Sequence, residues 1–332
     1  MTAAWRPRLV LAMSTGTRDQ LMTPELAARL RAVADVDPGT AVGDFTDPAA
    51  VEGAEILLTG WGAPRIDRAA LELMPRLRAV VHAAGTVKPY IAPEAFDRGV
   101  LVASAAEANA VPVAEFTFAA IVFAAKRVPS VAGQYRKRRD FSARALAGGV
   151  NGITVGVVGA SRVGRRLLGL LRNLDVSVLV SDPYLPDPEA AALGAARAEL
   201  DDLVRRSDIV TLHAPALPST RHMIGAARLA AMKDAAVLIN TARGSLIDTE
   251  ALIAELRRGR ISALLDVTDP EPLPPDSPLW DLPNVTLTPH IAGAMGNEVP
   301  RLLEQAVGEI ERLAAGLPVR YPVTAADLGR IA

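Results

Sequence analysis

Short apolar runs alternate with helical patterns along almost the whole chain, and this alternation limits the folds that the chain can adopt. In the first third, the strand-length apolar runs are residues 8–13, 55–61, 77–84 and 100–104. Helical patterns at residues 24–33 and 93–98 lie between them. Strands that alternate with helices are typical of parallel α/β architecture. We therefore expect an α/β fold.

The second half repeats this alternation with more strongly apolar strands. The runs are TVGVVG, SVLVSD, DIVTLH, AVLINTA, ALLDV and VTLTP, which begin at residues 154, 177, 208, 236, 263 and 285. Continuous branched-aliphatic runs indicate strands covered on both faces. A final helix is expected over about 297–315. Since 332 residues exceed what one hydrophobic core usually serves, we expect two domains.

A long apolar helix and a basic segment connect the two groups of strands. We expect the helix to begin near Pro112, because proline is tolerated in a first helical turn, and to run to about Val128. Its run Phe116–Ala125 is about half the length of a membrane crossing, which favours a buried helix. Residues 133–152 are expected to be irregular. Their charge run, Arg136–Arg139, is most simply a solvated face, with an oligomer contact or a guard for an anion site as alternatives.

Charge and cysteine content exclude several classes of function. The 36 basic and 37 acidic residues give a formal net charge of −1, which removes the electrostatic basis for binding nucleic acid or an anionic membrane. The absence of cysteine excludes disulfides, thiolate metal sites and a cysteine nucleophile. The apolar run before residue 14 is too short for a signal-peptide core. We expect a cytoplasmic protein that binds a small molecule.

The stretch TVGVVGASRVG places glycines 156, 159 and 164 where a strand gives way to a helix. Ser161 stands where the common dinucleotide fingerprint has its second glycine, so the backbone there approaches a diphosphate less closely, although the hydroxyl could donate to it. The next strand ends at Asp182. A helix N-terminus attracts a pyrophosphate, and such a carboxylate accepts bonds from ribose hydroxyls. We expect a dinucleotide site; a plain βαβ turn is the alternative.

Three polar residues follow the carboxyl ends of predicted strands, namely Arg243, Glu271 and His290. These strand ends lie on one edge of a parallel sheet, so the three side chains can converge. Arginine binds a carboxylate, histidine exchanges a proton near neutral pH, and a carboxylate orients the imidazole and favours its protonated form. Reduction of a 2-oxo acid needs these functions. The alternative for Arg243 is a loop-capping group. For Glu271 it is a solvated loop acid, and for His290 it is a buried core histidine.

An ordered set of motifs carries a family resemblance. The motifs GVVGASRVG, SDPYL, HAPALPSTRHMI, LINTARGSLID and LDVTDPEPLPPDSPLWDLPNVTLTPHIAG lie between about residues 152 and 293. Together they resemble the D-isomer-specific 2-hydroxyacid dehydrogenase family. The resemblance implies that Arg243 holds the substrate's carboxylate and carbonyl oxygen, that Glu271 is the partner of His290, and that His290 is the acid/base. Ala84 and Gly85 match the family's substrate loop, whose backbone N–H groups bind the carboxylate.

The resemblance also implies NAD as the cofactor, with no metal. Asp182 would bind the adenosine ribose, and Gly159, Ser161, Arg162 and Val163 would lie at the diphosphate. The positions that match the adenosine and nicotinamide parts of the cleft are His213, Pro215, Thr220, Thr241, Ala242, Asp266 and Gly293.

The architecture implied by the resemblance has two doubly wound parallel-sheet domains. A Rossmann NAD-binding domain would span 107–293, and a discontinuous flavodoxin-like substrate domain would combine 1–106 with 294–332. A homodimer would form around an arm at about 112–152. The chain departs from family habit in the sequence TVKPY after Gly85, which introduces Lys88. In addition, Thr268 replaces an aromatic residue that is common in the family, and Phe116 stands where many relatives have a histidine. The segment GRISALLDV is one residue shorter than usual. These changes bear on substrate identity.

The expected function is interconversion of a 2-oxo acid and a D-2-hydroxy acid by hydride transfer, with glyoxylate- or hydroxypyruvate-type substrates favoured. One alternative is a regulatory protein that senses dinucleotide on the same fold. Another is a dehydrogenase of that fold that acts on an amino acid, phosphite, formate or another small acid.

Overall fold

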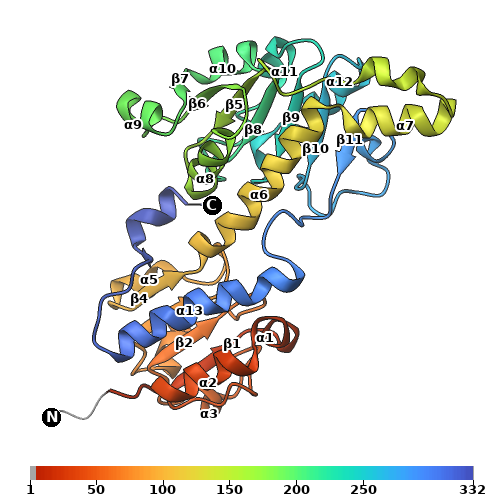
Figure 1. Ribbon diagram of the computed structural model, residues 1–332. Coiled ribbons are helices and arrows are strands. Elements are labelled where there is room, and N and C mark those ends of the chain that lie inside the picture. Colours follow the sequence, from red (N-terminus) through yellow and green to blue (C-terminus); the bar gives the residue numbers. More distant parts are fainter. Residues whose placement is uncertain (1–4, 332) are drawn as a thin grey trace. The chain divides into compact units, whose positions relative to one another are not determined.

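The computed structural model describes residues 5–331, which divide into two compact units (Figure 1). The first unit comprises the chain up to Ala110 together with Ala294–Ile331, and the second comprises Val111–Gly293. The first of these boundaries was expected between residues 106 and 107, and both this position and the observed one lie within one continuous helix, Ala106–Ala125.

The first unit is built on a five-stranded sheet in the order β1-β2-β3-β4-β12. The strands are β1 (Leu9–Ala12), β2 (Ile56–Thr59), β3 (Ala79–His82), β4 (Leu101–Ser104) and β12 (Pro322–Val323). The first four are parallel, and isolated parallel bridges attach residues 35 and 42 beside β1. If this segment is counted as a strand, the parallel order becomes 2-1-3-4-5, the flavodoxin-like order.

One strand of the first unit departs from the expected all-parallel sheet, because β12 runs antiparallel to β4. It begins with Pro322, a residue that sheets tolerate at an edge because no ladder bond is needed there. No sequence pattern indicated this pairing, since a two-residue strand is too short to show a periodicity.

Helices cover both faces of this sheet. On one face, α1 (Thr15–Leu21), α2 (Pro24–Val33) and α13 (Val299–Ala314) pack their leucines against β1 to β3. On the other face lie α3 (Pro48–Val51), α4 (Arg68–Leu73) and α5 (Pro93–Asp97). Helix α13 comes from the far end of the chain and lies beside α2, where Arg29 and Glu311 share two hydrogen bonds of 2.8 Å (Figure 1).

The second unit contains a seven-stranded parallel sheet in the order β11-β10-β9-β8-β5-β6-β7. The strands are β5 (Thr154–Val158), β6 (Ser177–Ser181), β7 (Ala196–Arg197), β8 (Ile209–Leu212), β9 (Val237–Asn240), β10 (Ser262–Leu265) and β11 (Val285–Leu287). Read from β7, this is the Rossmann order 3-2-1-4-5-6 with a seventh strand added. The order reverses between β5 and β8, where such sheets bind their ligands.

Helices cover both faces of the second sheet as well. One core contains side chains from α6 (Ala106–Ala125) and α8 (Arg162–Leu171), and the opposite core contains side chains from α10 (Leu200–Arg206), α11 (Ala226–Ala231) and α12 (Thr249–Arg257). The remaining helix of this sheet is α9 (Asp187–Ala192). Successive side chains along a strand pack alternately into the two cores, so both faces of the sheet are covered, as the continuous apolar runs predicted.

The connecting region differs from its sequence-based description at two places. Helix α6 begins at Ala106 and passes through Pro112, which forgoes one helical hydrogen bond. The alanine-rich residues before the proline favour helix strongly enough to extend it. Residues 133–152 are not irregular throughout, because α7 (Val128–Arg138) and the 3₁₀ helix η1 (Phe141–Leu146) occupy much of them. Basic residues favour the C-terminal turn of a helix, and the run Arg136–Arg139 there is exposed.

Within residues 5–331, α6 is the one helix long and apolar enough to cross a membrane by length and composition. Its Ala114 and Ile121 pack into the same core as Val155 and Val157 of β5. This packing explains the apolar character of the helix.

Two buried histidines make the stability of the fold sensitive to mild acid. Burial lowers the pKa of His82 to about 4 and that of His213 to about 3. In the unfolded chain both would titrate near 6.5, so the unfolded state gains protons first as the pH falls. Between about pH 7.5 and about pH 5.5 we expect each histidine to remove about 1.4 kcal/mol from the free energy of unfolding.

Urea unfolding at the two pH values measures this loss. His82→Gln should retain the part due to His213 and abolish the part due to His82. An equal pH dependence in the variant and the wild type would contradict the assignment.

Candidate active site

The turn after β5 leaves no room for side chains at two of its glycines. Gly159 has φ +98°, and a Cβ there would lie 2.6 Å from the backbone nitrogen of Ala214. A Cβ on Gly164 would lie 2.1 Å from the carbonyl oxygen of Gly159. Both distances are shorter than the contacts that real Cβ atoms make with other heavy atoms. The close packing of the turn, helix α8 and the neighbouring strand end therefore requires glycine at these positions.

Ser161 is the N-cap of α8, and its Oγ accepts a hydrogen bond of 3.4 Å from the N–H of Gly164. Serine at an N-cap stabilises the start of a helix. The residue that departs from the glycine fingerprint therefore has a structural role that the sequence analysis did not assign. Arg162 is exposed at the first position of the helix, and Val163 follows it.

Asp182, directly after β6, is fixed to the glycine turn by its own carboxylate. One oxygen accepts the N–H of Ala160 at 2.7 Å, and the other accepts the N–H of Tyr184 at 2.8 Å. Each carboxylate oxygen has a second lone pair, so both can still accept a hydroxyl. These contacts place the acid beside the turn, which is the arrangement that a dinucleotide ribose and diphosphate require.

His290 and Glu271 form the contact that the sequence predicted. The Nδ1 atom of His290 lies 2.7 Å from Oε1 of Glu271, and both side chains are about half exposed. His290 has φ +55°, a conformation that non-glycine residues adopt rarely. With Nδ1 facing the carboxylate, Nε2 is the ring atom left to face a substrate.

A buried carboxylate holds the His290 segment in this conformation. Asp266 follows β10 and is only 2% exposed. Its oxygens accept hydrogen bonds from the Thr288 hydroxyl at 2.6 Å and from the N–H groups of Ile291 and Ala292, both at 2.8 Å. The N–H of His290 also donates to the backbone carbonyl of Asp266 at 2.9 Å. The loop that presents the imidazole is therefore fixed on both sides of His290.

Arg243 follows β9 and belongs to the same site. Burial lowers the pKa of its guanidinium, while the Glu271 carboxylate raises it. Its backbone carbonyl accepts a 2.8 Å bond from the Asn240 amide. A Cβ on Gly244 would lie 2.0 Å from the backbone of Thr268, so the turn of Arg243 packs directly on the chain leading to Glu271. The three residues expected to converge are thus assembled within the second unit.

Other candidate residues also follow strand ends of this sheet. His213, after β8, is buried, with Nε2 3.0 Å from the Thr211 hydroxyl. The hydroxyl of Thr241, after β9, lies 2.9 Å from that of Thr117 on α6. The contacts that Thr211 and Thr117 make with these candidates were not predicted, because a threonine inside an apolar strand or helix carries no distinguishing pattern.

The remaining candidates lie in three places. Pro215 and Thr220 share a loop in which the threonine hydroxyl donates to the proline carbonyl at 2.6 Å. Ala242 is partly buried beside Arg243, and Gly293 is the last residue of the second unit. Ala84 and Gly85 belong to the first unit, after β3, where a Cβ on Gly85 would lie 3.3 Å from the Asn109 amide.

A family model described as the D-isomer specific 2-hydroxyacid dehydrogenase, NAD binding domain matches residues 118–292. The D-3-phosphoglycerate dehydrogenase of Methanocaldococcus jannaschii is 33% identical over 262 residues, covering 78% of this chain and 49% of that protein. The glyoxylate reductase of Thermofilum pendens is 35% identical over 260 residues, covering 76% of each chain. The chain spans about half the length of the phosphoglycerate dehydrogenases that it matches.

Solved structures agree with the observed fold. The TT0316 protein of Thermus thermophilus has a TM-score of 0.76 and 31% identity, covering 96% of this chain and 100% of that one. A D-lactate dehydrogenase from Aquifex aeolicus, solved with NAD and lactic acid, has a TM-score of 0.70 and 26% identity, covering 93% and 95%.

The Rossmann sheet, the glycine turn and the acid at the end of β6 define an NAD-binding α/β protein. More specifically, the chain belongs to the D-isomer-specific 2-hydroxyacid dehydrogenase family.

Proposed function

We propose that the protein is an NAD-dependent dehydrogenase that interconverts a 2-oxo acid and a D-2-hydroxy acid, with glyoxylate- or hydroxypyruvate-type substrates favoured. The observation that carries the proposal is the 2.7 Å contact between His290 and Glu271 beside Arg243, in the NAD-binding unit. The relatives named glyoxylate reductase support the substrate class.

In the direction of reduction, the guanidinium of Arg243 binds the carboxylate and carbonyl oxygen of the substrate. Its planar group of N–H donors suits this contact. Glu271 accepts a hydrogen bond from Nδ1–H of His290 and stabilises the imidazolium. Nε2 then gives its proton to the carbonyl oxygen as the carbonyl becomes a hydroxyl. NADH, when bound, supplies the hydride to the carbonyl carbon.

The other roles implied by the family resemblance are part of the proposal. The first unit would be the substrate domain, with the backbone N–H groups of Ala84 and Gly85 binding the carboxylate. The residues proposed to bind NAD are Gly159, Ser161, Arg162, Val163, Asp182, His213, Pro215, Thr220, Thr241, Ala242, Asp266 and Gly293. The glycine turn and Asp182 support this most directly, because the turn excludes side chains and the acid is fixed beside it.

A panel of substrates tests the proposal. NADH oxidation is followed with glyoxylate, hydroxypyruvate, pyruvate, phenylpyruvate and longer 2-oxo acids. Turnover of one or more members is expected, with glyoxylate or hydroxypyruvate best. Tight NADH binding without turnover of any member would overturn the proposal in favour of a dinucleotide sensor.

Replacing Glu271 by glutamine should move the alkaline limb of the reduction rate to lower pH. The carboxylate 2.7 Å from Nδ1 favours the protonated imidazole, and glutamine keeps the shape but removes the charge. Reduction needs the protonated form, so activity should fade at a lower pH. The rate is measured across pH for both proteins. An unmoved limb would mean that Glu271 is not the functional partner, and Asp269 would be tested next.

A homodimer built around the arm at 112–152 is also part of the proposal. Phe123, Tyr135, Phe141 and Leu146 on this arm are exposed. Exposed large apolar side chains gathered on one segment mark an interaction surface. The molar mass of the purified chain in solution tests this assignment. The cytoplasmic location stays a prediction.

A further inference from the structure

Polar side chains from outside the loop that carries Glu271 contact this loop at Asp269. The Thr249 hydroxyl, at the start of α12, donates a 2.8 Å hydrogen bond to the backbone carbonyl of Asp269. The guanidinium of Arg221 lies 3.7 Å from the carboxylate of the same aspartate. Within the loop, the Thr268 hydroxyl donates to the Pro270 carbonyl at 2.8 Å. Three polar contacts thus converge on the three residues before Glu271.

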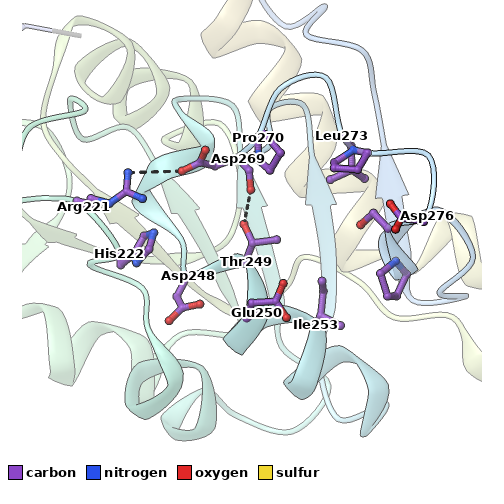
Figure 2. A pocket seen from close by; sticks show the side chains of 13 residues that line it. Arg221, His222, Asp248, Thr249, Glu250, Ile253, Asp269, Pro270, Leu273 and Asp276 are labelled. Atoms are coloured by element: carbon purple, nitrogen blue, oxygen red, sulfur yellow. Dashed lines mark hydrogen bonds and ion pairs between the residues drawn. The ribbon is translucent and has the colours of Figure 1, made fainter.

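A cavity of about 460 Å³ lies beneath this loop (Figure 2). Its lining comes from the first turns of α12, from Arg221 and His222, and from the loop residues between Asp269 and Pro278. Figure 2 shows Thr249 and Arg221 reaching the Asp269 end of the loop from two directions. The cavity lies between part of the loop and the first turns of α12, and the contacts of Thr249 and Arg221 fix the Asp269 end of the loop beside it.

Glu271 depends on such support for its geometry. It is about half exposed and lies two residues after Asp269. The His290 loop is fixed by Asp266, so it cannot follow a movement of Glu271. The 2.7 Å contact between the two side chains therefore requires that the backbone at Glu271 is fixed as well. A shift of about 1 Å in a catalytic group can cost about a hundredfold in rate.

We propose that Thr249 and Arg221 are positioning residues that hold Glu271 against His290 by anchoring Asp269. Neither residue is required to touch the substrate or NAD. The inference rests on the proposed function for its effect on turnover, but the geometry of the Glu271–His290 pair can be tested without turnover.

The matched variants are Thr249→Val and Thr249→Ser. Valine removes the hydroxyl at nearly constant volume, whereas serine retains it. We expect Thr249→Val to lower kcat about tenfold, with little change in KM for NADH, and to move the alkaline limb of the rate to lower pH. Thr249→Ser should restore both. Arg221→Gln should act in the same direction with a smaller effect, because its contact with Asp269 is long and exposed.

A double variant separates positioning from general damage to the fold. If Thr249 acts through Glu271, Thr249→Val should have little further effect on kcat or on the pH profile in the Glu271→Gln background. Additive effects in the double variant would overturn the proposal, as would a normal pH profile in Thr249→Val.

The NMR signals of the histidine rings provide the readout that needs no substrate. The chain has four histidines, so the His290 signal is assigned by its loss in His290→Gln. The charged groups of the second unit around this ring are Glu271 at Nδ1, Arg243, which interacts electrostatically with Glu271, and Asp266, whose carboxylate is bonded to the His290 loop.

At one fixed pH, the ring signals of His290 in Thr249→Val should move toward those in Glu271→Gln, and Thr249→Ser should match the wild type. Wild-type ring signals in Thr249→Val would reject the positioning role. Shifted signals in a protein that turns over no 2-oxo acid would instead keep the positioning role and reject the proposed function.

Discussion

Replacing His290 by glutamine is expected to lower kcat by about 10² to 10⁴ while NADH binding stays nearly intact. This range is typical for the loss of a positioned general acid. His290 is presented by a fixed loop, with Nδ1 bonded to Glu271 and Nε2 left for the substrate. Glutamine can accept or donate a hydrogen bond, but it cannot deliver a proton near neutral pH.

The comparison uses steady-state rates together with NADH binding by fluorescence. His222→Gln is the matched control, because His222 is an exposed histidine of the same unit that also has a positive φ, of 51°. It should retain near-normal turnover. Near-normal turnover in His290→Gln would show that this histidine is only structural.

The second large effect is a preference for NADH over NADPH of about a hundredfold or more. The Asp182 carboxylate can accept bonds from both ribose hydroxyls, and charge-assisted bonds are among the stronger ones. A 2′-phosphate removes one donor and brings like charges together. The carboxylate cannot simply turn away, because Ala160 and Tyr184 hold both of its oxygens.

Values of kcat/KM for the two cofactors at one series of substrate concentrations measure this preference. Asp187→Asn serves as a control, since Asp187 is an acid of the same region that begins α9, whereas Asp182 directly follows β6. It should leave the ratio unchanged, whereas Asp182→Asn should reduce it. Equal values for the two cofactors in the wild type would mean that Asp182 does not face the ribose.

Much of the architecture could be predicted because the strands of the Rossmann unit are covered on both faces. Runs such as SVLVSD and AVLINTA are apolar throughout, and parallel pairing then places their carboxyl ends on one edge. That single inference was enough to bring Arg243, Glu271 and His290 together.

The start of one helix, the shortest strands and the contacts between residues distant in sequence could not be predicted in the same way. The start of α6 was misplaced, because a proline is tolerated in a first helical turn but can also lie inside a helix when its neighbours favour helix strongly. The two-residue strands β7 and β12 are too short to have a period. No local pattern indicates that Asp266 fixes the loop of His290, that Asp182 fixes the glycine turn, or that Thr249 reaches Asp269, since each bond joins residues about twenty positions apart.

The most direct test of the central claim follows the hydride itself. The protein is incubated with NADH that carries deuterium at the transferable position and with the best 2-oxo acid of the panel other than glyoxylate, because the reduction product of glyoxylate has no D and L forms. The product is then analysed by mass spectrometry and chiral chromatography. We predict the D-2-hydroxy acid with one deuterium on the carbon that bears the hydroxyl. An L product, or a product whose hydrogen at that carbon comes from solvent, would contradict the account.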